Sequence, residues 1–208
     1  MNHSDVRMIF GDLTNAFEEL KQSIQSPKSV RRTFSLFVEL SQKLTSTMRK
    51  EYSSTTGDKW EASKYMGWNN VTELFKKLRN TDQHDWPIVI VVHERQYFRI
   101  DESSNGHLVN EGTWELSDQL SDLPPSGAKL FLVDPKTGLT SDIEINPAKI
   151  EYEFLLHPRT DEKKELLKRA NTNNVHVLSA ECFAVLQNYY DYYQQRLTAQ
   201  QKNRGDRE

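Results

Sequence analysis

Apolar residues in the N-terminal 84 residues recur at three- and four-residue spacings, the period of an amphipathic helix. The first series ends at Pro27, and a second series after Pro27 predicts another helix that runs to about Tyr52. After a turn at residues 53–57, Asp58 and Glu61 have the spacing of a capping box and predict that a third helix begins there, with Gly67 as a break or kink. The apolar positions of the three helices are Ile9, Leu13, Phe17, Leu20 and Ile24; Val30, Phe34, Phe37, Val38, Leu44 and Met48; and Trp60, Trp68, Val71, Leu74, Phe75 and Leu78.

The period changes at residues 86–92. Trp86-Pro87 ends the helical pattern, and Ile88–Val92 is an unbroken apolar run rich in β-branched residues, which is typical of a strand buried on both faces. Gly-, Pro- and Asn-containing turns separate further apolar segments. We expect these strands at residues 96–100, 108–116, 129–133, 141–145 and 150–155, joined in one antiparallel sheet of four to six strands.

Helical spacing returns at residues 160–169, is interrupted at 171–174, and resumes over 175–201. The predicted fold class is α+β and mainly helical. In this arrangement, the last long helix packs against the first three in a four-helix bundle, and an antiparallel β-sheet module is inserted between them. The segments are 1–85 (helices), 86–155 (β module) and 156–208 (closing helices); the alternative is two separate domains joined near Trp86.

Charge divides the chain in the same way. The 27 basic and 30 acidic residues give a net charge of −3, which argues against binding of duplex nucleic acid by charge alone. The 86–155 segment carries −7, whereas each flank carries +2. The single cysteine, Cys182, rules out an internal disulfide, and the longest apolar run is too short to span a bilayer. We therefore expect a cytoplasmic protein that is not inserted in a membrane.

One short segment carries candidate chemistry. In residues 78–84, Leu-Arg-Asn-Thr-Asp-Gln-His, Arg79 lies beside Asn80 and five residues before His84. An arginine stays charged and presents parallel N–H donors to a phosphate, whereas a histidine with a pKa near ~6.5 can both accept and donate a proton. Cleavage of RNA by its own 2′-hydroxyl needs a base, an acid and positive charge at the phosphorus, and these two side chains supply them without a metal.

This segment resembles the R-X4-6-H motif of the HEPN superfamily, in which a polar residue such as Asn80 often follows the arginine. The resemblance implies a four-helix bundle and a metal-independent endoribonuclease, often with one cleft built from two protomers, as in bacterial toxins and phage-defence systems. It assigns phosphate binding to Arg79, proton transfer to His84 and an orienting role to Asn80. It covers the motif and its helical flanks, and does not cover residues 86–155.

Several alternatives stay open at this point. Arg169 and His176 also fit the spacing, but Ala170 follows the arginine. Arg79 and His84 are equally explained as a surface cation near a helix end and a loop residue. The tyrosines 189, 190, 192 and 193 are either stacking groups for RNA bases or, as we prefer, core or dimer contacts. Basic residues on helices are either an RNA track or ordinary solvated faces; the candidates for such a track are Arg31, Arg32, Lys76 and Lys77, with Arg49 and Lys50.

The sequence thus predicts a HEPN-like ribonuclease that binds RNA, forms a homodimer and needs neither a metal nor another cofactor. Its acidic β module would then mimic RNA or contact a regulatory protein. The alternative function is a non-catalytic interaction protein whose helices form a dimer core and whose sheet binds a protein partner.

Overall fold

A computed structural model describes residues 4–60, 65–84, 88–97, 111–117, 130–133, 137–138, 140–145 and 149–205. The protein is α+β and mainly helical, as predicted. Its helices are α1 (Ser4–Gln22), the short 3-10 helix η1 (Ser23–Gln25), α2 (Pro27–Thr56), α3 (Asn70–His84), α4 (Asp161–Ala170) and α5 (Val175–Gly205). Its strands are β1 (Ile90–Tyr97), β2 (Glu111–Ser117), β3 (Leu130–Val133), β4 (Thr140–Ile145) and β5 (Lys149–Leu156). No helix within these described ranges is both long enough and apolar enough to cross a membrane.

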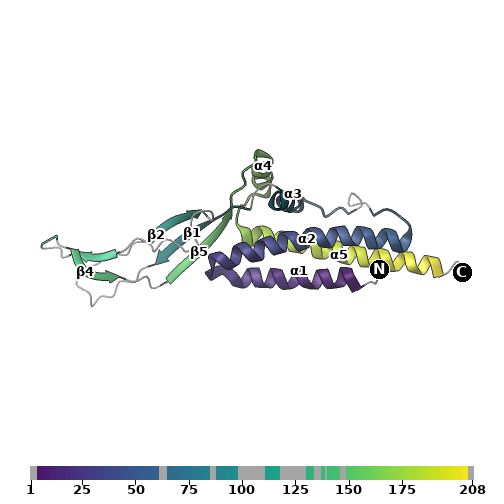
Figure 1. The fold of residues 1–208 in the computed structure, drawn as a ribbon, viewed down its shortest axis with the longest axis horizontal. Helices are drawn as coiled ribbons and strands as arrows, with labels where there is room; N and C mark the ends of the chain where they lie inside the picture. The colour runs from purple at the N-terminus through teal and green to yellow at the C-terminus, as the bar shows by residue number, and fades with distance from the viewer. Residues whose placement is uncertain are drawn as a thin grey trace.

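The four helices α1, α2, α3 and α5 pack around one continuous hydrophobic core. Figure 1 shows α1, α2 and α5 side by side, with α3 along α2 on the side away from α1. The ring of Phe75 on α3 lies edge-on to both Phe34 and Phe37 on α2, with 5.6 Å between centroids in each pair. The apolar positions predicted for the second and third helices therefore pack against each other. The C-terminal helix α5 completes the bundle.

A second aromatic cluster fills the end of the bundle far from the sheet. Trp60, which follows α2, packs edge-on against Tyr52 and donates its Nε1–H to the hydroxyl of Tyr189. Tyr189 and Tyr193 on α5 are completely buried, and Tyr190 and Tyr192 pack at the edge of the core. The interpretation of these tyrosines as core residues is confirmed, so Tyr189 and Tyr193 are not surface platforms for bases.

The start of α3 differs from the prediction. Residues 58–60 are not helical, and α3 begins at Asn70. The side-chain Oδ1 of Asn69 accepts hydrogen bonds from the backbone N–H groups of Val71 and Thr72, both at 3.1 Å, while Thr72 Oγ1 accepts from the Asn69 N–H at 3.0 Å. This reciprocal pair is a capping box. The cap is therefore at 69/72 rather than at Asp58, which directly follows the left-handed Gly57 that ends α2 and precedes the buried Trp60.

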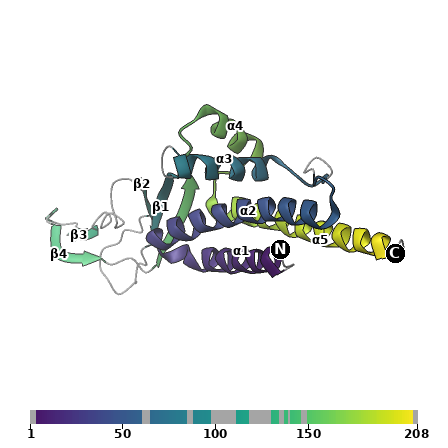
Figure 2. The same cartoon turned by 45° about the vertical axis from the view of Figure 1, so that its right-hand side comes forward.

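The strands that the structure describes form two sheets, not the single sheet that was expected. β1 lies between β2 and β5 in an antiparallel three-stranded sheet, and β3 pairs with β4 in a separate two-stranded sheet. The predicted strands at 96–100 and 88–92 are not separate: residues 96 and 97 belong to β1, and residues 98–100 lie outside the described part. Figures 1 and 2 show β4 at the tip of the molecule, far from the bundle.

Residues 88–92 are buried on both faces, as predicted. Ile88, Ile90 and Val92 join the helical core, whereas Val89 and Val91 are buried but are not part of that core. Side chains alternate between the two faces of a strand, so the even-numbered residues face the helices. Phe154 and Leu156 on the neighbouring β5 add to the same face. The sheet is therefore packed onto the bundle by its first strand and its last.

Helix α4 lies across the outer side of α3 (Figure 2). Lys77 on α3 forms a 2.8 Å ion pair with Glu162, and Leu166 is buried in the same core. Asn171 ends α4 in the left-handed conformation with φ of 55°, and its N–H donates to the carbonyl of Lys168. Asn174 Oδ1 then accepts from the N–H groups of His176 and Val177 at the start of α5. The asparagines of the 171–174 break thus end one helix and start the next.

The Asn69→Ala variant tests the position of the cap. Replacement removes the acceptor for two N–H groups and the 2.8 Å bond from Nδ2 to Glu181, so we expect a loss of about 1–2 kcal/mol in the free energy of unfolding. Urea unfolding followed by circular dichroism measures it. Asp58→Ala is the matched control, and we expect a change within about 0.5 kcal/mol. A larger effect at Asp58 than at Asn69 would contradict the assignment.

Candidate functional site

Arg79 lies on α3, five residues before the end of the helix, and its side chain is half-buried. Its Nε is sealed from solvent and has no hydrogen-bond acceptor among the residues that the structure describes. A buried donor without an acceptor costs roughly 1–3 kcal/mol. Phe75 lies one turn before Arg79 on the same face of α3. The packing of Phe75 against α2 therefore positions the part of the helix from which the Arg79 side chain extends.

Asn80 and His84 belong to the same helix, and His84 is its last residue. Residues five apart in an α-helix differ by about 140° around the helix axis, so the helix alone does not bring positions 79 and 84 to one side. The side chains of Asn80 and His84 lie outside the described part of the structure, and their catalytic roles stay predictions.

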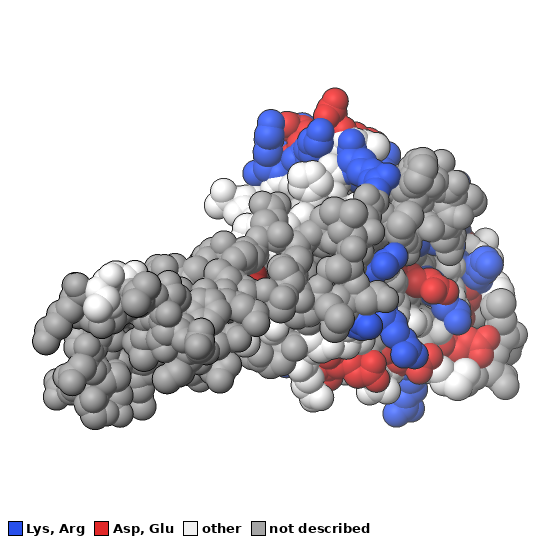
Figure 3. Space-filling view, turned by 60° about the vertical axis from the view of Figure 1, so that its left-hand side comes forward, with Lys and Arg blue, Asp and Glu red and all other residues white. Residues whose placement is uncertain are grey.

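The four candidate RNA-binding cations belong to two helices, α2 and α3. Arg31 and Arg32 are exposed at the start of α2. Lys76 pairs with Glu73 at 3.5 Å, and the Lys77–Glu162 pair raises the pKa of the lysine through a hydrogen bond and the nearby negative charge. Figure 3 shows lysine and arginine side chains interspersed with acidic ones over the helical part. Lys77 therefore joins α4 to α3, and the prediction that it binds RNA has no further support.

The second Arg–His pair has structural roles. Arg169 pairs with Glu165 at 3.5 Å on α4. The Nε2 of His176 lies 3.1 Å from the carbonyl oxygen of Leu20, and its ring packs edge-on against Phe154. Burial lowers the pKa of His176, an effect that the hydrogen bond to Leu20 partly offsets. His176 thus connects the end of α1 to the start of α5 as a neutral imidazole.

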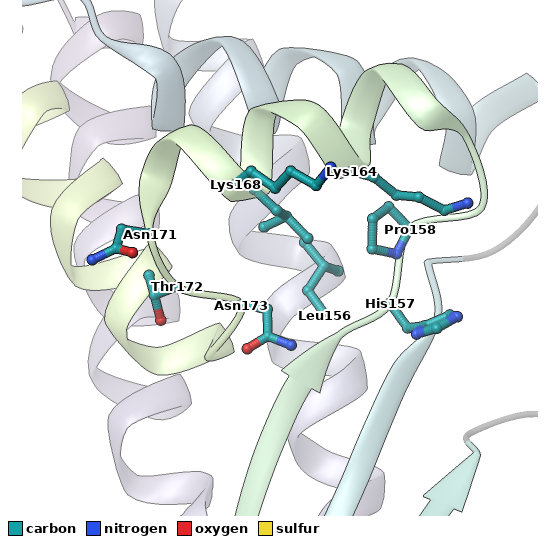
Figure 4. Close-up of a pocket in the computed structure, with 9 residues that line it drawn as sticks. Leu156, His157, Pro158, Lys164, Lys168, Asn171, Thr172 and Asn173 are labelled. Carbon is teal, nitrogen blue, oxygen red and sulfur yellow. The ribbon is translucent and has the colours of Figure 1, made fainter.

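A cavity of about 490 Å³ lies between α4 and the end of β5. Figure 4 shows Lys164 and Lys168 along α4 above Leu156, with His157 and Pro158 at one end and Asn171 and Thr172 at the other. The remaining lining residues are Leu167 and Asn173. The cavity is a hollow that is broadly open to solvent, and it combines an apolar floor with a few polar groups at its edge.

Two backbone hydrogen bonds join the end of β5 to neighbouring segments beside the cavity. The N–H of Leu156 donates to the carbonyl of Asn173 at 2.7 Å, and the N–H of His157 donates to the carbonyl of Val89 at 3.0 Å. This site was not predicted from the sequence. One signal was present: positions 164, 167, 168 and 171 share one face of a helix, so α4 has a second face besides the one packed on α3.

Two groups with reactive side chains are enclosed in the core. Burial raises the pKa of the Cys182 thiol far above its ordinary value, so this thiol stays protonated, and its interpretation as a small buried hydrophobe is confirmed. Burial and the neighbouring Glu51 carboxylate raise the pKa of Tyr193 in the same direction. Neither group contacts the cavity or Arg79, and neither is a candidate nucleophile.

Comparison of the chain with protein-family models, curated proteins and solved structures gives no match. The candidate sites are therefore those that the chain itself presents: Arg79 with the end of α3, and the cavity beside α4.

His176 predicts a pH dependence of stability. Its pKa is lower in the folded state than in the unfolded chain, where it is about 6.5, so the unfolded state binds more protons between the two values. We therefore expect the free energy of unfolding to fall as the pH decreases from about 6.5 toward the pKa of the folded state. Above about pH 6.5, His176 should not contribute to the pH dependence of stability. Chemical unfolding of the wild type and of His176→Gln between pH 7.5 and 5.5 measures the difference, which should be smaller in the variant. An equal slope in both proteins would show that His176 is not responsible.

Proposed function

We propose that this protein is a metal-independent endoribonuclease that cleaves single-stranded RNA in the cytoplasm and acts as a homodimer. The observation that carries the proposal is the half-buried side chain of Arg79 on α3, five residues before the end of the helix. A guanidinium group stays charged and can present parallel N–H donors to a phosphate through its terminal nitrogens. The resemblance of residues 79–84 to the HEPN motif is the second support.

Cleavage requires no reactant other than the RNA, because the nucleophile is its own 2′-hydroxyl. A base takes the proton of the 2′-hydroxyl, and the 2′-oxygen forms a bond to phosphorus. The bond from phosphorus to the 5′-oxygen breaks, and an acid protonates that leaving oxygen. The products are a 2′,3′-cyclic phosphate and a 5′-hydroxyl. Arg79 would stabilise the negative charge on the five-coordinate phosphorus, and His84 would move the protons.

A dimer fits the arrangement along α3. Positions 79 and 84 lie about 140° apart around the helix, so a phosphate held by the arginine of one chain would meet the histidine of its partner more easily than that of its own chain. Base and acid would then be the His84 residues of opposite protomers. One of them would be neutral and accept a proton, and the other would be protonated and donate one.

Cleavage assays on purified, EDTA-treated protein test the proposal. We expect the wild type to cut a single-stranded RNA, and both His84→Ala and Arg79→Gln to lower the rate at least about 100-fold, because each removes a proton-transfer or charge-stabilising group. The products should carry 2′,3′-cyclic phosphate ends, and a substrate with 2′-deoxyribose throughout should not be cut.

Arg169→Gln is the matched control, because it makes the same chemical change at an arginine that is largely exposed and paired with Glu165. It should cleave like the wild type. Activity that persists in His84→Ala, or that falls equally in Arg169→Gln, would refute the assignment of the site.

A second function, that of a non-catalytic interaction protein, is favoured by one feature. Aromatic rings line the seam between α1 and α5: Phe10 stacks on Tyr190 with 4.1 Å between centroids, and the buried Phe17 stacks on Phe183 with 4.4 Å. Phe10, Phe183 and Tyr190 are half-buried. Aromatic side chains with one open face are enriched in protein interfaces. A protein that is dimeric in solution but inactive in the assay above would support this function.

A further inference from the structure

We propose that the cavity between α4 and the end of β5 holds one nucleotide of single-stranded RNA close to the bond that is cut. The substrate class rests on the proposed function, whereas the binding itself rests on the cavity.

The floor of the cavity suits a base. Leu156 and Leu167 are buried, and Pro158 is half-buried, so the floor is aliphatic. At about 490 Å³, the cavity is large enough for a base with its sugar. His157 is exposed at one end of the hollow (Figure 4), and an imidazole ring there can stack on a base. These groups would hold a base by contact with its faces, without choosing a sequence.

The rim of the cavity suits a phosphate. Lys164 and Lys168 line it, and no acidic side chain is among its lining residues in the described part of the chain. Lys164 pairs with Asp161 at 3.0 Å and Lys168 with Glu165 at 3.9 Å, but Asp161 is 98% exposed and Glu165 is 53% exposed. Exposed pairs contribute little free energy, so a phosphate can replace these carboxylates at small cost.

The cavity and the motif are connected over a short distance. Val89, whose carbonyl binds the N–H of His157, is five residues after His84, so the two α-carbons are at most about 18 Å apart. The Lys77–Glu162 pair also holds α4 against the helix that carries Arg79. A strand only a few nucleotides long could therefore occupy both sites, with one nucleotide in the cavity and the next phosphates toward the end of α3.

Binding of a non-cleavable strand tests the proposal separately from catalysis. The probe is a fluorescein-labelled 2′-O-methyl hexauridylate, which lacks the nucleophilic hydroxyl, and fluorescence anisotropy gives Kd over a range of salt concentrations. We expect the Lys164→Gln/Lys168→Gln variant to raise Kd at least about tenfold. The slope of log Kd against log salt should also fall by about 1.4, since each lysine–phosphate contact on a single strand contributes about 0.7.

Lys43→Gln, a neutral replacement of an exposed lysine on α2, is the matched control and should bind like the wild type. Thermal unfolding confirms that all variants are folded. Loss of affinity that is equal in Lys43→Gln, an unchanged Kd in the double variant, or no binding by the wild type would each overturn the proposal. Uridine 3′-monophosphate that competes as strongly as the hexamer would also overturn it, because the cavity would then be a site for free nucleotides.

The two proposals fail in different ways. If the double variant weakens binding as expected but no His84-dependent cleavage is found, the cavity is a nucleotide site and the ribonuclease function is wrong. If cleavage depends on His84 but the double variant binds the hexamer normally, the ribonuclease function stands and the cavity is not its subsite.

Discussion

The packing of α3 against α2 holds in place the helix that carries Arg79 and that pairs with α4. Phe75 sits edge-on to Phe34 and Phe37, and the buried Leu74 and Leu78 continue the same contact along α3. Loss of one such ring costs about 3–5 kcal/mol in other cores, so the contact is a large part of what holds α3 in place. Arg79 stands one turn beyond Phe75, and Lys77 holds α4 from the outer side. The arginine, the ion pair and the cavity beside α4 are all positioned from this one contact.

Much of the fold was predictable because its signals are local. The three- and four-residue spacings located the helices, and the β-branched run at residues 88–92 located a buried strand. The start of α3 was not predictable in this way, since Asp58 and Asn69 both begin a pattern that fits a cap. The choice between them depends on Trp60, which packs against tyrosines about 130 positions later in the chain. The division of the strands into two sheets likewise depends on pairing between distant residues.

The candidate sites were likewise only partly predictable from local sequence patterns. The sequence pattern placed Arg79 near the end of a helix and left open whether His84 belongs to that helix or to the following loop. In the structure α3 extends to His84, so the two positions are about 140° apart around its axis. The cavity was not predicted because its lining comes from three short segments, 156–158, 164–168 and 171–173. They meet only because Asn171 adopts a left-handed conformation and Asn173 accepts a backbone hydrogen bond from Leu156. Neither event leaves a pattern in the sequence that is specific for a cavity.

The strands that lead away from the bundle and back to it, β1 and β5, are antiparallel neighbours from Ile90–Leu156 to Tyr97–Lys149. The two ends of the segment between β1 and β5 are therefore held together by a ladder of backbone hydrogen bonds. When the ends of a segment are held together in this way, each doubling of its length adds only about 0.6 kcal/mol to the entropic cost of closing the loop. The outer part of the protein can consequently gain or lose whole hairpins during evolution while the helices keep their packing.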